Sequence, residues 1–569
     1  MLMSRMKTRA RSCPQTRDQT AVSPQTEQEF LEGIGGRYVG TQVNTQLVRA
    51  WLHECECKHG KACMPSSRLP VERDKAPTFA VDVIQSCLVD TPSQCRYVAL
   101  SYVWGTAVVF KHLQENTRDL RKPGALRSLP IPATIRDAMT LVRAIGERYL
   151  WVDSICIIQN DLKMQQAEIM QMGSIYSNAL FTIIAAAGDH ANSGLPGVEG
   201  GSREEVQKTL KLASCELLTV IDVRRTPSGI DDTAWAQRAW TFQERVLSNR
   251  VLVFSENQVY WSCRSASHSE ERALEPVEDI DRLHLTYPQK LATDHFPWES
   301  LQPLEYRYLY DDLLTGYRQR RLTYETDMLN AFNGVTEMLA AIQNDKFLWG
   351  LPESQFSYAM TWDLIGYCLR NYIKVPIFES NGSRKTIPIP SWSWAGWSGK
   401  ESTHHGVVID GDHNLVRPVI QFSIVDSKYQ LVRIDERPDD HGRALWQNTQ
   451  PHQLQSLPPH SHSQIGQLHF WTSFANVRAI RSWVLAGRRV NYMLFPSPDL
   501  QLDPGATHDR AEIVHQDFIV IAARGTGAKL VLLAIEWSDG VAYRVGMAEV
   551  KEADWVQVKN REWRLITLG

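Results

Sequence analysis

Two stretches, YVALSYVWG at residues 97–105 and YLWVDSICIIQND at residues 149–161, decide the fold, because each passes from an apolar run into polar residues. Together with LFTIIAAA at residues 180–187 they predict three buried strands, and the residues between them predict two helices. Nearly continuous apolar strands joined by helices are typical of a parallel sheet that is covered on both faces. The sequence therefore predicts an α/β domain with a parallel sheet between Tyr97 and Ala187.

The two connecting helices have recognisable starts. Pro132 and Thr134 precede a run in which Ile135, Ala138 and Leu141 recur at helical spacing. The second helix is predicted to begin after Asp161, a residue type that caps helix N-termini well.

An acidic residue falls inside the second predicted strand, at residues 149–158. Asp153 is surrounded there by apolar and β-branched residues. Burying a carboxylate is costly unless it is paired. Asp153 is therefore predicted to have a partner, either an arginine or backbone and hydroxyl donors.

Polar residues gather where the first two predicted strands end. The carboxyl ends of parallel strands meet at one edge of the sheet, where α/β proteins bind ligands. We expect this edge to form a ligand-binding rim of Ser101, Trp104, Gly105, Asp153, Gln159 and Asp161.

Glu168 is the candidate catalytic residue. It lies about two turns into the second predicted helix and shares a stripe with Met172 and Ile175. A carboxylate at the border of an apolar face can have its pKa raised and can stabilise a developing positive charge. The alternative is structural: Glu168 is a solvated helix residue, and Asp153 is a buried hydrogen-bond anchor.

The segment WAQRAWTFQERVLSNR at residues 235–250 mixes aromatic and charged side chains. Its tryptophans are more often part of a core than of a ligand platform. We therefore favour a packed structural network, with a docking surface as the alternative. The network residues are Arg238, Trp240, Gln243, Glu244, Arg245 and Arg250.

The segment CECKHGKAC at residues 55–63 is a weak metal candidate. Cys55, His59 and Cys63 are separated by three residues each, and Cys57 or His53 could supply a fourth ligand. Zinc prefers such cysteine and histidine sets, but the usual pair of CxxC knuckles is missing. We favour ordinary thiols and assign no metal.

Four separated blocks of the sequence resemble the fungal heterokaryon incompatibility (HET) domain family. They are the first stretch above, LPIPATIRDAMTLVRAIGERYLWVDSICIIQND (129–161), MGSIYSNALFTIIAAAGDHANSGLPG (172–197) and WAQRAWTFQERVLSNRVLVFS (235–255). The resemblance covers about residues 97–263. It implies a self/nonself recognition protein that triggers cell death through assembly with protein partners or with itself.

The same resemblance implies a distant likeness to TIR domains. Enzymatic TIR domains cleave the nicotinamide–ribose bond of NAD with a glutamate on the helix after a central strand, and Glu168 occupies the comparable place. The resemblance therefore implies an alternative function as an NAD glycohydrolase. NAD would then be a substrate, and no cofactor is expected.

Length and composition suit a soluble protein of several domains. The 569 residues have a formal net charge of −3 and a pI near 6.6, which gives no electrostatic reason to expect nucleic acid as a partner. No apolar run is long enough to span a membrane, and we expect a cytoplasmic protein.

We predict six segments along the chain. They are a disordered tail (1–36), a lead-in (37–96), the HET domain (97–263), a helical and then Trp/Pro-rich region (264–435), a linker (436–466) and a β-rich region (467–569).

Overall fold

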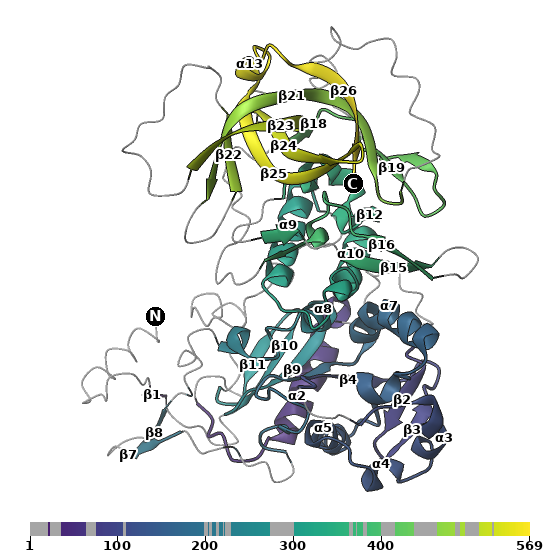
Figure 1. Cartoon of the computed structure of the whole chain (residues 1–569). Helices are drawn as coiled ribbons and strands as arrows, with labels where there is room; N and C mark the ends of the chain where they lie inside the picture. Colours follow the sequence, from purple (N-terminus) through teal and green to yellow (C-terminus); the bar gives the residue numbers. More distant parts are fainter. Residues whose placement is uncertain are drawn as a thin grey trace. The chain divides into compact units, whose positions relative to one another are not determined.

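The structure is a computed structural model, and it divides the chain into two compact units (Figure 1). The first unit holds residues 1–301, 320–322 and 330–341, and the second holds residues 302–319, 323–329 and 342–569. The residues that the structure describes are 21–22, 36–63, 76–105, 110–198, 203, 207–211, 216–219, 221, 229–272, 301–362, 368–370, 373–378, 384–399, 416–436, 464–483, 490–494, 511–525 and 529–569.

An eight-stranded sheet forms the centre of the first unit, in the order β11-β10-β9-β6-β4-β5-β2-β3. Its strands are β2 (Phe79–Asp82), β3 (Cys87–Asp90), β4 (Tyr97–Ser101), β5 (Tyr149–Trp151), β6 (Thr182–Ala185), β9 (Arg250–Phe254), β10 (Val259–Cys263) and β11 (Ser267–Ser269). Elsewhere in this unit β1 (Ala21–Val22), β7 (Thr209–Lys211) and β8 (Glu216–Thr219) form a small separate sheet.

The prediction of a parallel sheet is confirmed for the four central strands. β5, β4, β6 and β9 pair in parallel, whereas hairpins extend the sheet at both edges. The chain passes from β4 to β5 on one side and then returns to β6 on the other, so the strand order reverses beside β4. Open α/β sheets bind ligands at such a switch point, outside the carboxyl ends of the strands.

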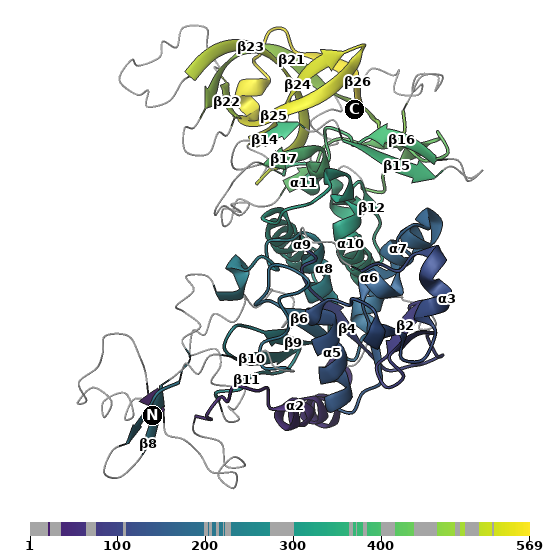
Figure 2. The same cartoon turned by 60° about the horizontal axis from the view of Figure 1, so that its bottom comes forward.

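Helices cover both faces of this sheet. The main helices of the first unit are α2 (Thr45–Lys58), α5 (Ala133–Ala144), α7 (Leu162–Asn178), α8 (Trp240–Leu247) and most of α10 (Asn330–Gln343). Crossovers between parallel strands are almost always right-handed, and α5 and α7 lead from β4 and β5 in opposite directions. They therefore lie on opposite faces (Figure 2). The Tyr97 hydroxyl donates to the Ile175 carbonyl of α7 at 2.6 Å.

The second predicted strand is shorter than expected, and its interior acid is not in a strand. β5 ends at Trp151, and Asp153 begins the helical turn α6 (Asp153–Cys156). The Cys156 amide donates to the Val152 carbonyl at 2.7 Å, which closes the turn. A short apolar run cannot be divided into strand and buried helical turn by its periodicity. The assignment of Asp153 to a strand interior is therefore wrong.

The second predicted helix begins as expected. The Asp161 carboxylate accepts hydrogen bonds from the Lys163 and Met164 amides, each at 3.1 Å, and caps α7. At the other end of this helix, glycine allows a close approach. A Cβ on Gly173 would lie 2.9 Å from the Cα of Gly334 in α10.

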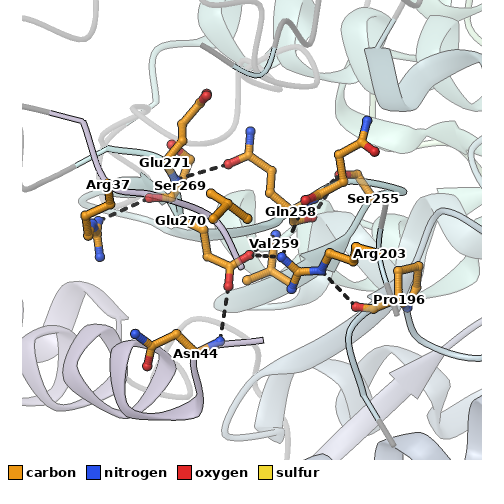
Figure 3. A network of polar contacts seen from close by, with 12 residues as sticks. Arg37, Asn44, Pro196, Arg203, Ser255, Gln258, Val259, Ser269, Glu270 and Glu271 are labelled. Carbon is orange, nitrogen blue, oxygen red and sulfur yellow. Dashed lines mark hydrogen bonds and ion pairs between the residues drawn. The ribbon is translucent and has the colours of Figure 1, made fainter. Parts of the chain in front are cut away.

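A buried ion pair lies between the edge of the sheet and the segment that precedes α2 (Figure 3). The guanidinium of Arg203 and the carboxylate of Glu270 form this pair, and their side chains are only 1% and 4% exposed. The Glu270 carboxylate also accepts from the Asn44 amide at 3.2 Å and from the Val259 amide at 2.9 Å. Glu270 therefore connects three segments that are far apart in the sequence.

The second unit combines helices with a β-rich region, which confirms the predicted β-rich C-terminal part. Within the described part of this unit, the α-helices are α9 (Pro303–Arg318), α11 (Phe356–Ala359) and α13 (Glu552–Trp555). Three two-stranded sheets pair β12 (Phe347–Leu348) with β13 (Leu351–Pro352), β14 (Cys368–Arg370) with β17 (Trp397–Gly399), and β15 (Lys374–Phe378) with β16 (Arg384–Pro388).

A nine-stranded sheet forms the rest of the second unit. Its strands are β18 (Val416–Pro418), β19 (Ser423–Val425), β20 (Leu431–Arg433), β21 (Leu468–Trp483), β22 (Val490–Leu494), β23 (Ala511–Arg524), β24 (Lys529–Ser538), β25 (Val541–Lys551) and β26 (Glu562–Leu568). β21 pairs with both β22 and β23. β22 pairs with β25, β25 with β24, and β24 with β23, so these strands form a closed ring of pairs.

The predicted tail at residues 1–36 and the predicted linker at residues 436–466 lie mostly outside the described residues. Among the residues that the structure describes, no helix is long and apolar enough to cross a membrane.

Candidate functional site

Three elements bring polar side chains together at the carboxyl edge of the parallel strands. Ser101 ends β4, Asp153 follows β5 and begins α6, and Glu244 projects from α8. We call the group around them the rim cluster. Its members are Ser101, Tyr102, Trp104, Asp153, Ser154, Trp235, Arg238 and Glu244.

The inner part of the rim cluster is buried. The Ser101 hydroxyl donates to the Glu244 carboxylate and accepts from the indole N–H of Trp235 at 2.7 Å. All three residues are at most 6% exposed. Ser101 therefore links a β-strand to α8 through a hydrogen bond to a buried carboxyl group.

The outer part of the rim cluster reaches the surface. The Trp104 indole donates to Asp153 Oδ2 at 2.9 Å, and the Ser154 amide donates to Asp153 Oδ1 at 2.7 Å. The guanidinium of Arg238 donates to the Tyr102 carbonyl at 2.9 Å. Trp104, Asp153 and Arg238 each keep some exposure to solvent.

Burial raises the pKa of both carboxyl groups in the cluster. For Asp153 the pKa rises to about 6, against the opposing charge of Arg238 and the bonds from Ser154 and Trp104. For Glu244 the pKa rises to about 7 through burial and the charge of Asp153, against the bond from Ser101. Two interacting carboxyl groups of this kind titrate as a pair.

Carboxyl groups that titrate near neutral pH suit proton transfer. Strongly perturbed acids at the ligand-binding edge of an α/β sheet are also more common at functional sites than elsewhere. Asp153 is the member of the pair that reaches solvent, so it is the group that a ligand or partner would meet.

Removing the titration of Glu244 gives a pH-dependent test. The unfolded chain releases the Glu244 proton around the ordinary pKa of 4.5. The folded protein keeps this proton until the pH reaches about 7, because its Glu244 pKa is raised to that value. Stability from this group is therefore full below pH 4.5 and is lost as the pH rises through 7. We expect Glu244→Gln to reduce the loss of stability between pH 5 and pH 8 by on the order of 3 kcal/mol.

Hydrogen exchange of the β4 amides at several pH values measures this effect. The variant also removes the charge interaction between Glu244 and Asp153, so the difference between wild type and variant measures the contribution of Glu244 together with this coupling. An equal dependence on pH in both proteins would contradict a neutral Glu244.

The remaining predicted rim residues, Gly105, Gln159 and Asp161, have structural roles in the loops that follow the strands. Gly105 has a φ of +74°, and a Cβ there would lie 2.5 Å from the Cβ of His190. The Gln159 side chain donates to the Asp153 carbonyl at 3.0 Å. Asp161 caps α7 and accepts from the side chain of Gln114 at 2.9 Å. Gln159 thus adjoins the rim cluster, whereas Asp161 lies at the start of the next helix.

Glu168 lies apart from the rim cluster. Its side chain accepts from the amide of Thr78 at 3.2 Å and from the Thr78 hydroxyl, just before β2. The residue is 4% exposed, and burial raises its pKa. The second carboxyl oxygen, Oε2, has no hydrogen-bond partner among the described residues.

The structure distributes the 235–250 network over three places. Arg238 and Glu244 belong to the rim cluster. The Gln243 side chain accepts from the Gly334 amide at 3.2 Å, and Arg250 donates to the Leu180 carbonyl at 3.1 Å and to the Cys55 sulfur at 3.0 Å. Trp240 packs against the main core and is half-buried, and Arg245 lies on the same helix.

A separate cleft of about 440 Å³ opens at the carboxyl ends of β6 and β9. Asp137, Arg203 and Glu256 supply its charged groups. The residues that line this cleft include no member of the rim cluster, although the loops after β4 and β6 are joined by a hydrogen bond from the Ala191 amide to the Trp104 carbonyl at 3.2 Å.

Sequence reasoning placed Ser101 and Glu244 in different groups. The pairing joins residues 143 positions apart, so no local spacing indicates it. The one available signal is Ser101 itself, a hydroxyl that directly follows four apolar strand residues. The roles of Tyr102 and Ser154, whose hydroxyl groups meet at 2.9 Å, had no such signal.

Fold and site together define a doubly wound α/β domain with one buried and one partly exposed carboxyl group at the carboxyl edge of its sheet. Residues 97–244 match the family model described as heterokaryon incompatibility protein (HET), from the first residue of β4 to Glu244 in α8. Residues 97–244 therefore correspond to a HET domain. No curated protein and no solved structure matches the chain.

Proposed function

We propose that the HET domain is the effector of a fungal self/nonself recognition protein and triggers cell death through assembly with a protein partner or with a second copy. The observation that carries this proposal is the family match at residues 97–244, which includes every member of the rim cluster. The domain boundaries at 97–263 and the cytoplasmic location belong to the same proposal.

We expect assembly to depend on contacts that the rim cluster makes with the partner. Trp104 is anchored by Asp153 and lies beside Lys111, whose ammonium group is 5.3 Å from the indole ring centre. Tryptophan and arginine are the residue types most often found at binding hot spots. Trp104 and Arg238 offer both types beside a carboxyl group that titrates near neutral pH.

A second candidate function is TIR-like cleavage of NAD by Glu168. The observation that favours it is a carboxyl group on the helix after β5 that has a raised pKa and one oxygen without a hydrogen-bond partner among the described residues. Departure of nicotinamide leaves an oxocarbenium-like ribose, which a carboxylate stabilises. The contact with Thr78 must open before a ribose can reach this carboxyl group.

Inducible expression of the full chain in a fungal host tests both functions. Viability and cellular NAD are followed together for wild type and for Glu168→Gln at matched protein abundance. Under the assembly mechanism, both proteins kill and NAD does not fall before viability. NAD loss that precedes death and disappears with Glu168→Gln would support the enzyme instead. Survival of cells with abundant, folded wild-type protein would contradict both functions.

A further inference from the structure

Four potential metal ligands converge on the other side of the first unit, away from the rim cluster. Cys55 lies in α2, His59 caps its C-terminus, and Cys63 ends the 3₁₀ helix η2 (Gly60–Cys63). The fourth is Cys263, the last residue of β10. The four ligand atoms all lie within 4.8 Å of one another, and the three cysteines are buried.

The local sequence explains how three of these side chains meet. Residues four apart share one face of a helix, so Cys55 and His59 project together at the end of α2. The η2 turn then brings Cys63 back to the same place. The buried face of α2, which includes Trp51 and Leu52, packs into the main core, and this packing holds the three ligands against β10.

The separations fit a tetrahedral zinc site. Zinc–sulfur bonds of about 2.3 Å and zinc–nitrogen bonds of about 2.0 Å in a tetrahedron require ligand atoms roughly 3.5–3.8 Å apart. The sulfur of Cys263 lies 3.3 Å from His59 Nδ1, and the remaining pairs are within the limit given above. Small side-chain adjustments would therefore suffice to coordinate an ion.

The groups that surround the cysteine sulfur atoms are hydrogen-bond donors, which suit negatively charged thiolates. The buried guanidinium of Arg250, 3% exposed, donates to the Cys55 sulfur at 3.0 Å. The Ala266 amide points at the Cys263 sulfur at 3.3 Å, and the Ser265 hydroxyl lies 3.5 Å from the Cys63 sulfur. Donors to ligand atoms are typical of the outer shell of metal sites.

Charge balance points the same way. Three thiolates, one neutral histidine and one Zn²⁺ ion have a net charge of −1, which the buried Arg250 would neutralise. With three neutral thiols instead, the Arg250 charge would be left buried, which is costly.

We propose that Cys55, His59, Cys63 and Cys263 bind one structural zinc ion, which fastens α2 to the end of β10. Four protein ligands leave no open position for a substrate, so the site is structural rather than catalytic. The ion joins residues 200 positions apart and secures the segment that precedes the HET domain to its sheet. Cys57, which is exposed on the same helix, takes no part.

Metal analysis of the purified full chain tests this proposal. We expect ~1 zinc per chain by mass spectrometry of the metals in wild type and in the matched control Cys57→Ser. Cys263→Ser should reduce the bound zinc by more than about tenfold. His59→Cys should retain the ion, since four cysteines also form a zinc site.

A second measurement uses only the wild-type protein, so its result does not depend on whether the variants fold. Cobalt added to metal-free wild type should give the intense visible bands and the sulfur charge-transfer band of a tetrahedral thiolate site. Zinc should also protect three cysteines from alkylation, including Cys263. Absence of zinc and of cobalt bands in folded wild type, or a disulfide between any two of the three cysteines, would overturn the proposal.

Discussion

Replacing Glu270 by alanine is expected to lower the free energy of unfolding of the first unit by about 3–5 kcal/mol. The change leaves the Arg203 guanidinium buried without its carboxylate and removes the acceptor of the Asn44 and Val259 amides. Breaking one partner of a buried ion pair is costly because the other charge remains buried without its counter-charge. Hydrogen exchange of the β9 and β10 amides measures the loss.

An exposed ion pair in the same unit supplies the matched control. Asp119 and Lys122 are paired at 2.7 Å, and both side chains are 68% exposed. Surface pairs of this kind contribute little, so Asp119→Ala should lower the free energy of unfolding far less than Glu270→Ala does. If Glu270→Ala lowers the free energy of unfolding no more than Asp119→Ala does, the buried ion pair does not hold the segment that precedes α2 on the sheet.

The parallel sheet could be predicted because its strands are continuous apolar runs joined by amphipathic helices. The start of α7 could be predicted because Asp161 caps it through local contacts. The end of β5 could not, since Val152 to Ile158 are apolar or small around Asp153 and suit a strand as well as a buried turn. Tertiary packing decided between the two.

The candidate site could be predicted only in part, because its bonds join distant residues. The edge of the sheet was predictable from the expected parallel direction of its strands, so Ser101, Trp104 and Asp153 were placed on one rim. The partner of Ser101 lies on α8, 143 positions further along the chain, and its burial depends on how that helix packs. The cysteine cluster shows the same limit, since Cys263 is distant from the other three ligands.

The second large effect is expected for Asp153→Asn in the cell-death assay. Asparagine can keep the bond from the Ser154 amide that starts α6, because its carbonyl oxygen accepts as Oδ1 does. Its NH₂ group would face the Trp104 indole N–H, so Trp104 loses its acceptor. The charge opposite Arg238 disappears as well. We expect a folded protein whose killing activity falls on the order of a hundredfold, as when one partner of a charge pair is lost from an interface.

Asp161→Asn is the matched control for this variant. It makes the same chemical change at the same edge of the sheet, and asparagine caps a helix as well as aspartate does. Asp161 lies outside the rim cluster, so its variant should kill like wild type.

Viability after induced expression of wild type, Asp153→Asn and Asp161→Asn, at equal abundance of folded protein, tests most directly whether the rim cluster carries the effector function. The account predicts that wild type and Asp161→Asn kill and that cells with Asp153→Asn survive. Killing by Asp153→Asn at the wild-type level would contradict it and would reduce the rim cluster to a structural role.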